Sequence, residues 1–208
     1  ISPIDAPVII DIARMRSGID LSSGVALALQ DFTAGNTLDI VSLLDELPPT
    51  YWTQWHRTLP VPRHRAVSIA AALATCSAGA RTLIEAAAVV GRSTTLSHLA
   101  QLAEIDDVVG ALDSAFASGL LSVHEQHGST EVSLSSTMVT AAVRGALGPA
   151  HLHLLHTRAA KIAWGEGERL FHLAAASTTH DEDLAAELVA YASLRASDGA
   201  WSEVADAM

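Results

Sequence analysis

The sequence predicts a mainly α-helical protein with a helical lid, a winged helix that includes a small β-hairpin, and TPR-like helical pairs. Apolar residues recur at helical spacing along most of the 208 residues. The spacing changes to a period of two only within residues 121–134, which indicates the hairpin. Because proline and glycine breaks separate these parts, we expect three domains, at residues 1–65, 66–148 and 149–208.

Three short helices are expected in residues 1–47. Pro7 lies early in the first helix, where a missing amide N–H costs little. Gly35-Asn36 is a turn signal in front of the third helix. The expected apolar faces are, in order, Ile9, Ile12 and Ala13; Val25, Leu29 and Phe32; and Leu38, Val41, Leu44 and Leu47.

Residues 48–65 are predicted to connect the lid to the next domain, because four prolines forbid a continuous helix. Two interpretations of this connector remain open. In the favoured one, its tryptophans pack on a neighbouring helix and its arginines face water. In the other, its cations contact a phosphate group or a partner. The side chains concerned are Tyr51, Trp52, Trp55, His56, Arg57, Arg63, His64 and Arg65.

The second domain is expected to begin with a helix over residues 66–76 and to continue, after a Ser77 cap, into the first helix of the winged helix. Gly91 is a suitable C-cap for that helix. Thr94 and Thr95 offer N-cap hydroxyls for the second helix. The expected apolar faces of these three helices are Val67, Ala70, Ala71 and Ala74; Leu83, Ala87 and Val90; and Leu96, Leu99, Ala100 and Ala103.

A third helix and a two-stranded wing complete the expected winged helix. Asp106 and Asp107 favour a helix start there, because acidic groups stabilise the positive N-terminal end. Gly119 is the expected stop, and His127-Gly128-Ser129 supplies the hairpin turn. Ser135 or Ser136 is expected to cap the next helix. The apolar positions are Val109, Leu112, Ala115 and Phe116 on the third helix, Leu121, Val123, Val132 and Leu134 on the strands, and Met138, Val139, Ala142 and Val143 after them.

Residues 149–208 are predicted to form helical pairs that begin an α-solenoid. Gly148-Pro149 is a helix-breaking pair that marks the start of this domain. Asp181 is expected to cap one helix, and Asp198-Gly199 is expected to form a turn before a last helix over residues 200–208. The expected apolar faces are Leu152, Leu155, Ala159 and Ile162; Leu170, Leu173 and Ala174; and Leu184, Leu188, Tyr191 and Leu194.

Composition points to a cytoplasmic protein without a membrane partner. The formal net charge is −11, which disfavours nucleic acid and anionic membranes as direct partners. Cys76 is the single cysteine, which fits a reducing compartment. No apolar run is long enough to cross a bilayer. The chain opens with Ile1 rather than Met, so we expect a piece of a longer protein.

The charge of the third helix argues against DNA binding, although a winged helix often binds DNA. Residues 106–118 carry three aspartates and no lysine or arginine, whereas affinity for a duplex comes mostly from cations that contact phosphate. Only Arg81, Arg92 and Arg144 are available elsewhere in the winged helix. We therefore expect a packing or relay role and keep a DNA-binding module as an alternative.

The sequence predicts no catalytic, cofactor or metal site in this chain, and hence no enzyme. Lys161 is the only lysine and no P-loop surrounds it. His151, His153 and His156 could suggest a metal site, but only the last two share a helical face and no Cys or carboxylate completes a set nearby. Exposed or capping histidines are the favoured interpretation.

Several segments, in this order, resemble the middle of the large ATP-dependent LuxR-family transcriptional regulators, which are STAND signal-transduction ATPases related to MalT. Residues 33–38 (T-A-G-N-T-L) are similar to the family's T-G-G-N-P-L turn, and residues 83–91 (L-I-E-A-A-A-V-V-G) to its L-L-E-A-A-A-V-L-G. Residues 112–121 (L-D-S-A-F-A-S-G-L-L) resemble L-D-E-A-V-A-A-G-L-L, and residues 155–160 (L-H-T-R-A-A) resemble L-H-R-R-A-A. Thr37 replaces the family's proline, and residues 134–136 (L-S-S) replace its F-x-H after the wing.

The resemblance implies a regulatory fragment that couples nucleotide state to effector or partner binding. ATP or ADP with Mg²⁺ would belong to the parent protein, and the family's lid turn approaches the nucleotide, which makes Gly35-Asn36 the segment of interest. The implied partners are an upstream ATPase domain, the downstream solenoid of the same chain, an effector protein or small molecule, and a second copy. A stand-alone interaction or dimerisation scaffold is a further alternative.

Overall fold

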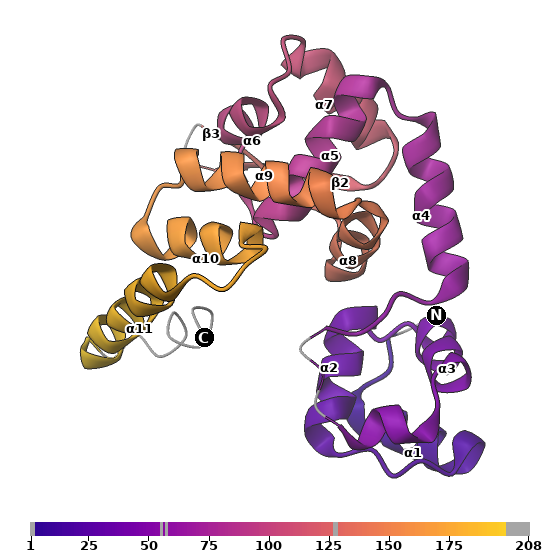
Figure 1. Cartoon of the computed structure of the whole chain (residues 1–208). Helices are drawn as coiled ribbons and strands as arrows, with labels where there is room; N and C mark the ends of the chain where they lie inside the picture. Colours follow the sequence, from indigo (N-terminus) through magenta and orange to yellow (C-terminus); the bar gives the residue numbers. More distant parts are fainter. Residues whose placement is uncertain (1–2, 55, 57, 127–128, 199–208) are drawn as a thin grey trace.

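The computed structural model describes residues 3–54, 56, 58–126 and 129–198. These residues form a mainly helical protein with one small antiparallel sheet, so the predicted fold class is confirmed (Figure 1). Two hydrophobic cores are present. The lid core lies within residues 4–59, and the larger winged-helix core lies within residues 69–162.

Three short helices build the lid, as predicted: α1 (Ala6–Ser17), α2 (Ser23–Thr33) and α3 (Thr37–Glu46). Their N-termini are capped by the side chains of Asp5, Ser22 and Asn36, each of which accepts hydrogen bonds from orphan backbone amides. The short 3-10 helix η1 (Pro49–Thr53) follows.

The predicted apolar face of α3 is partly wrong, since Leu44 is buried and Leu47 packs against the lid core but the other two predicted residues are not buried. Leu38 is 62% exposed and Val41 is only partly buried, whereas Ile40, Leu43 and Leu44 form the buried face. The face is rotated because Asp39, which is also buried, turns inward to meet the next helix.

The connector behaves as the favoured interpretation expects for Trp52, which is buried in the lid core. The indole Nε1 of Trp52 has no hydrogen-bond partner among the described residues. Trp55 and Arg57 lie outside the described residues. The expectation that the connector's arginines face water is wrong for Arg65, which lies in a helix and pairs with a buried carboxylate.

Helix α4 (Arg63–Thr75) joins the two cores, and its predicted apolar face is wrong. All four predicted residues, Val67 among them, are exposed, whereas Ile69 and Cys76 are buried and Leu73 is partly buried. Two stripes two residues apart have the same helical spacing in this alanine-rich helix. The stripe with the bulkier side chains is buried, because it removes more apolar area from water.

The winged helix has the predicted order of helices and one strand more. Its elements are α5 (Ala78–Val90), β1 (Thr94–Thr95), α6 (Leu96–Ala103), α7 (Val108–Ala117), β2 (Leu121–Gln126), β3 (Ser129–Leu134) and α8 (Thr137–Ala146). The sheet order is β1-β3-β2, and all pairs are antiparallel. Strand β1, in which Thr94 pairs with Val132, was not predicted, because two residues are too few to show alternation. Of the two threonines offered as caps for α6, Thr95 is the one that caps it. The turn residues His127 and Gly128 lie outside the described residues.

Helix α5 is the centre of this domain. Eight of its 13 residues are buried, and it packs against α6, α7, α8, α9 and β3. Ser77 caps its start and Gly91, at φ 71°, ends it, both as predicted. In α7, by contrast, the predicted face is partly wrong, because Val109 and Phe116 are exposed and only Ala111 and Ala115 are buried.

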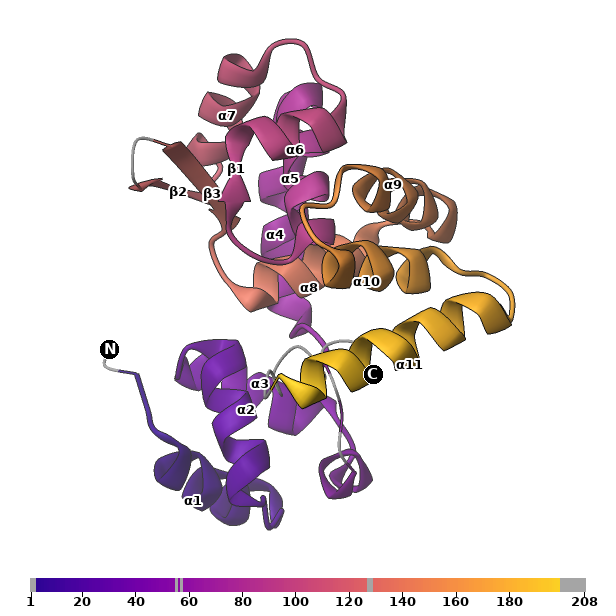
Figure 2. The ribbon, with the colours of Figure 1, turned by 90° about the vertical axis from the view of Figure 1, so that its left-hand side faces the viewer.

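Three helices follow the winged helix: α9 (Pro149–Ile162), α10 (Glu166–Ala176) and α11 (Glu182–Ser197) (Figure 2). Helix α9 packs on α5 and α6, while α10 packs along α9 and then against α11. Asp181 caps α11 as predicted, but Leu194 of its expected apolar face is exposed, and residues 199–208 lie outside the described residues. Within the described part of the chain, no helix is long and apolar enough to cross a membrane.

Candidate functional site

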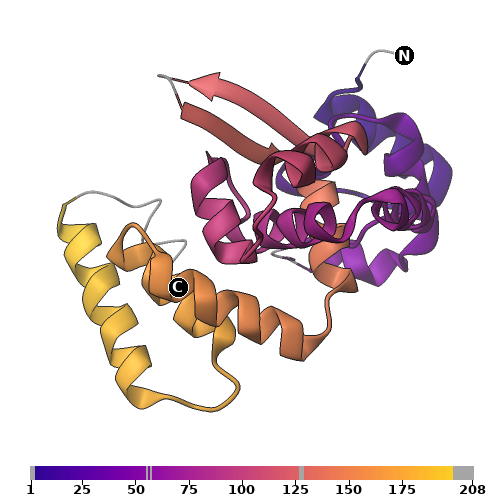
Figure 3. The same ribbon diagram turned by 90° about the horizontal axis from the view of Figure 1, so that it is seen from above.

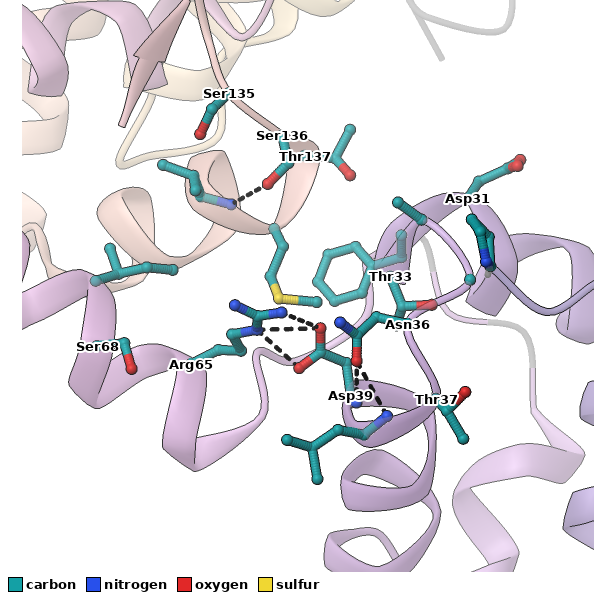
Figure 4. A pocket seen from close by; sticks show the side chains of 18 of the residues that line it. Asp31, Thr33, Asn36, Thr37, Asp39, Arg65, Ser68, Ser135, Ser136 and Thr137 are labelled. Atoms are coloured by element: carbon teal, nitrogen blue, oxygen red, sulfur yellow. Dashed lines mark hydrogen bonds and ion pairs between the residues drawn. The ribbon is translucent and has the colours of Figure 1, made fainter. Parts of the chain in front are cut away.

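A cleft of about 800 Å³ lies between the lid and the winged helix (Figure 4). Its lid wall is the turn between α2 and α3, and its opposite wall is the segment that leads from β3 into α8. The first turns of α4 contribute Arg65, Ser68 and Ile69 to the lining. The cleft is therefore lined by segments that lie about a hundred residues apart in the sequence.

The lid wall has a backbone shape that requires glycine at one position. Ala34 and Gly35 both adopt left-handed conformations, with φ values of 50° and 68°. A Cβ atom on Gly35 would lie 2.7 Å from the carbonyl oxygen of Ile4, whose amide donates a hydrogen bond of 3.0 Å to the Gly35 carbonyl. No other residue fits this close approach without moving the backbone.

Asn36 connects this turn to the start of α3. Its side-chain Oδ1 accepts hydrogen bonds from the amides of Leu38 (3.0 Å) and Asp39 (3.2 Å). The cap therefore satisfies two of the amides that a helix start leaves unpaired, and it fixes where Asp39 enters the cleft.

An ion pair between a buried carboxylate and a partly exposed arginine joins the lid to α4 at the cleft. Asp39 is 2% exposed, and its carboxylate accepts hydrogen bonds from Arg65 Nε (2.8 and 3.0 Å) and from a terminal guanidinium nitrogen of the same residue (2.9 Å). His64 Nε2 lies 2.8 Å from the same carboxylate. The hydrogen bonds to Asp39 raise the pKa of the Arg65 guanidinium above its ordinary value. Such a two-pronged contact fixes geometry as well as charge.

The opposite wall begins a helix, and it carries hydroxyl side chains beside Leu120, Met138 and Val139. Ser136 Oγ accepts a hydrogen bond of 3.2 Å from the Val139 amide and so caps α8, and the Ser135 amide donates to the Leu120 carbonyl at 2.9 Å. Thr137 lines the cleft beside them. Figure 4 shows Ser135, Ser136 and Thr137 on one side of the cleft and Thr33, Asn36 and Thr37 of the lid on the other, with the Ser136 hydroxyl turned toward its own helix. The amides at these two helix starts and the Arg65 guanidinium are hydrogen-bonded to Asn36, Ser136 and Asp39, and apolar side chains such as Phe32, Leu120 and Met138 also line the cleft.

Two segments singled out in the sequence come together here. Gly35-Asn36 and Ser135-Ser136 line the same cleft. Sequence reasoning missed Asp39 and the partner role of Arg65. A signal was present, because Asp39 is a carboxylate within the otherwise apolar stripe of α3 and Arg65 lies in the most cationic stretch of the chain.

The structure assigns the histidines differently from the prediction. His156 is 2% exposed and His172 is 1% exposed, and their Nδ1 atoms lie 2.9 Å apart. Burial lowers the pKa of each imidazole to about 4. The prediction of an exposed or capping histidine is therefore wrong for His156, whereas His153 Nδ1 contacts the Ala176 carbonyl at the end of α10 (2.7 Å). His151 lies 3.3 Å from Glu85.

The three arginines available for a DNA contact all have other surroundings. Arg92 pairs with Glu168 at 2.9 Å, and Arg81 donates to the Leu73 carbonyl at 3.3 Å. Arg144 is partly buried, and burial lowers its pKa. No group of three or more metal-ligating side chains occurs among the described residues.

A scan against protein-family models gave no match, and a search of curated proteins gave none either.

Proposed function

We propose that this chain is a regulatory, signal-relay segment of an ATP-dependent LuxR-type transcriptional regulator. In this proposal the lid and the winged helix pack against an ATPase domain of the parent protein, and the nucleotide state changes that packing. The helical pairs α9–α11 then pass the change to an effector or partner site. A protein with two packing arrangements is what such a relay requires.

One observation carries the proposal. The lid turn at Gly35-Asn36 resembles a family motif, whereas Ser135-Ser136 belongs to the segment that replaces the family's F-x-H, and both line one cleft of about 800 Å³. The spacing of the two segments in the sequence does not by itself require them to meet. Their convergence supports a shared surface that responds to one ligand or one neighbouring domain.

The Asp39–Arg65 ion pair supplies a means of relay. It lines the cleft and ties the lid to α4, the helix that leads into the winged-helix core. Among the described residues, Asp39 makes the ion pairs between the lid and the rest of the chain, to Arg65 and His64. A change at the cleft can therefore act directly on the connection between the two cores.

Hydrogen exchange of the parent protein tests the proposal. With ADP and then with a non-hydrolysable ATP analogue, we expect the exchange rates to differ at residues 33–37 and 135–139 and to stay equal in strands β2 and β3. The variant Asp39→Asn should reduce the difference, while Asp183→Asn on exposed α11 is the matched control. The proposal would be contradicted if the parent protein had no P-loop upstream, or if the exchange rates were equal with ADP and with the ATP analogue.

The alternative of a DNA-binding module is tested with this chain itself. Fluorescence anisotropy of labelled random duplex DNA at low salt reveals even non-specific binding, because phosphate contacts dominate there. We expect no binding at tens of micromolar. Salt-sensitive binding would instead make the winged helix the DNA-reading element.

A further inference from the structure

Helix α7 presents an apolar strip to the outside of the winged helix. Val109 is 68% exposed and Phe116 is 59% exposed. They are seven residues apart, which places them on one face about 10 Å from each other along the helix. Asp113 lies between them and is exposed as well. Figures 1 and 2 both show α7 at the end of the winged helix that is remote from the lid.

The same region is acidic, and its charges are unpaired. Asp106, Asp107 and Asp113 are exposed, and none of them makes an ion pair with a residue that the structure describes. Asp107 also caps α7, since its Oδ1 accepts a hydrogen bond of 2.9 Å from the Gly110 amide. The helix itself contains no lysine or arginine.

The other side of α7 is firmly held. Ala111 and Ala115 are buried, and α7 packs against α5. The two helices are close at Gly79 of α5, because a Cβ atom on that glycine would lie 3.4 Å from the Cβ atom of Ala111. The Ser114 hydroxyl accepts a hydrogen bond of 3.1 Å from the Ser77 amide. The outward strip is therefore presented by a rigid element, which lowers the entropic cost of binding.

We propose that this strip, Val109, Asp113 and Phe116 with Asp106 and Asp107, is a docking surface for a cationic amphipathic helix of a protein partner. Residues at i and i+7 match two turns of a helix that lies alongside, which is how amphipathic helices are recognised. An exposed aromatic residue is a typical anchor of such an interface. Charge complementarity sets the sign of the partner, because the carboxylates repel nucleic acid and attract lysine and arginine.

A model peptide tests the proposal on the whole chain. The probe is a fluorescein-labelled 14-residue peptide of leucine and lysine at helical spacing, and its anisotropy is measured at 150 mM NaCl. We expect binding that weakens at least ten-fold in the double variant Val109→Ser/Phe116→Ser. The double variant Asp106→Asn/Asp113→Asn should bind more weakly and with a smaller dependence on salt, because fewer charges attract the peptide.

Two controls separate this surface from general attraction to an acidic protein. Met15→Ser removes an even more exposed apolar side chain, 78% exposed on α1, and should leave binding unchanged. A peptide of the same composition without an apolar face should bind weakly to every variant. Equal melting temperatures show that all variants are folded, as expected for exposed positions.

Four outcomes would overturn the proposal. These are no peptide binding at 100 µM, equal binding of both peptides, an equal effect of Met15→Ser, and binding that Val109→Ser/Phe116→Ser leaves intact. Sedimentation of the chain alone decides a further case. Concentration-dependent association that disappears in Val109→Ser/Phe116→Ser would show that a second copy, rather than a cationic helix, covers this strip.

Discussion

Two polar contacts that join helices in the described part of the chain differ in charge and in burial. Asp39 and Arg65 join α3 to α4 as an ion pair, with the carboxylate 2% exposed and the guanidinium side chain 41% exposed. His156 and His172 join α9 to α10, and both are almost fully buried. The first contact lines a cleft, and the second lies between two packed helices.

The difference shows two ways in which a helix contact can respond to its surroundings. The ion pair depends on keeping both charges, and its partly exposed arginine can be reached by another ligand. The histidine contact needs one Nδ1 to donate and the other to accept, so the accepting ring must be neutral and protonation of both rings breaks the contact. Low pH should therefore weaken the histidine contact, whereas the ion pair is weakened when either of its charges is removed.

The largest expected effect follows from breaking the ion pair on its exposed side. Arg65→Ala leaves a buried carboxylate with only His64 beside it, and should lower the free energy of unfolding by about 3 kcal/mol. Urea unfolding at pH 7 measures the change. Arg14→Ala is the matched control, because Arg14 pairs with Asp20 on the surface at 3.0 Å and such pairs contribute little. Equal losses in the two variants would show that burial of Asp39 does not matter.

A smaller effect is expected from acid at the histidine pair. Both rings have a pKa of about 4 in the folded protein, below the ordinary value of 6.5, because burial disfavours the charged form. The unfolded chain therefore binds more protons between pH 6.5 and pH 4, and stability present above this window is lost as the pH falls through it.

The variant His172→Gln isolates this effect, because glutamine can keep a hydrogen bond and does not titrate. Between pH 7.5 and pH 5 the wild type should lose about 2 kcal/mol more stability than the variant. Urea unfolding at the two pH values measures the difference. If the wild type and the variant lost the same stability between the two pH values, the titration of His172 would not limit stability in acid.

The smallest expected effect concerns the uncharged part of the cleft. Asn36→Ala removes the cap of α3 and should cost about 1 kcal/mol. Ser77→Ala removes the cap of α5, away from the cleft, at a similar cost. Hydrogen exchange then distinguishes the two, since only Asn36→Ala should increase exchange in residues 33–39. Increased exchange there in both variants would show that the cleft reports general stability.

Much of the fold could be predicted from local signals. The caps at Ser77, Gly91 and Asp181 mark helix ends by hydrogen bonds within a few residues, so their positions are visible in the sequence. The hairpin was visible for the same reason, because alternation over six-residue strands is a local pattern.

The choice of buried face was not predictable in the same way. In α4, alanine occupies both candidate stripes, so the pattern alone does not decide which one meets the core. In α7, Val109 and Phe116 fit the helical period and are nevertheless exposed. Partners of buried polar groups, such as His172 for His156, depend on how distant helices pack, and the sequence spacing carries no trace of that contact.

Strands β2 and β3 extend beyond the helices that they adjoin, as Figure 3 shows from above. Helix α5, by contrast, is enclosed, because five other elements pack against it. A segment enclosed in this way cannot open by a local fluctuation, because each neighbour would have to leave first. The amides of α5 should therefore exchange only through global unfolding, and their protection would report the stability of the whole domain. Alanines such as Ala86 and Ala88, both 0% exposed, also leave no room for a larger side chain, so variation during evolution should be slowest in this helix.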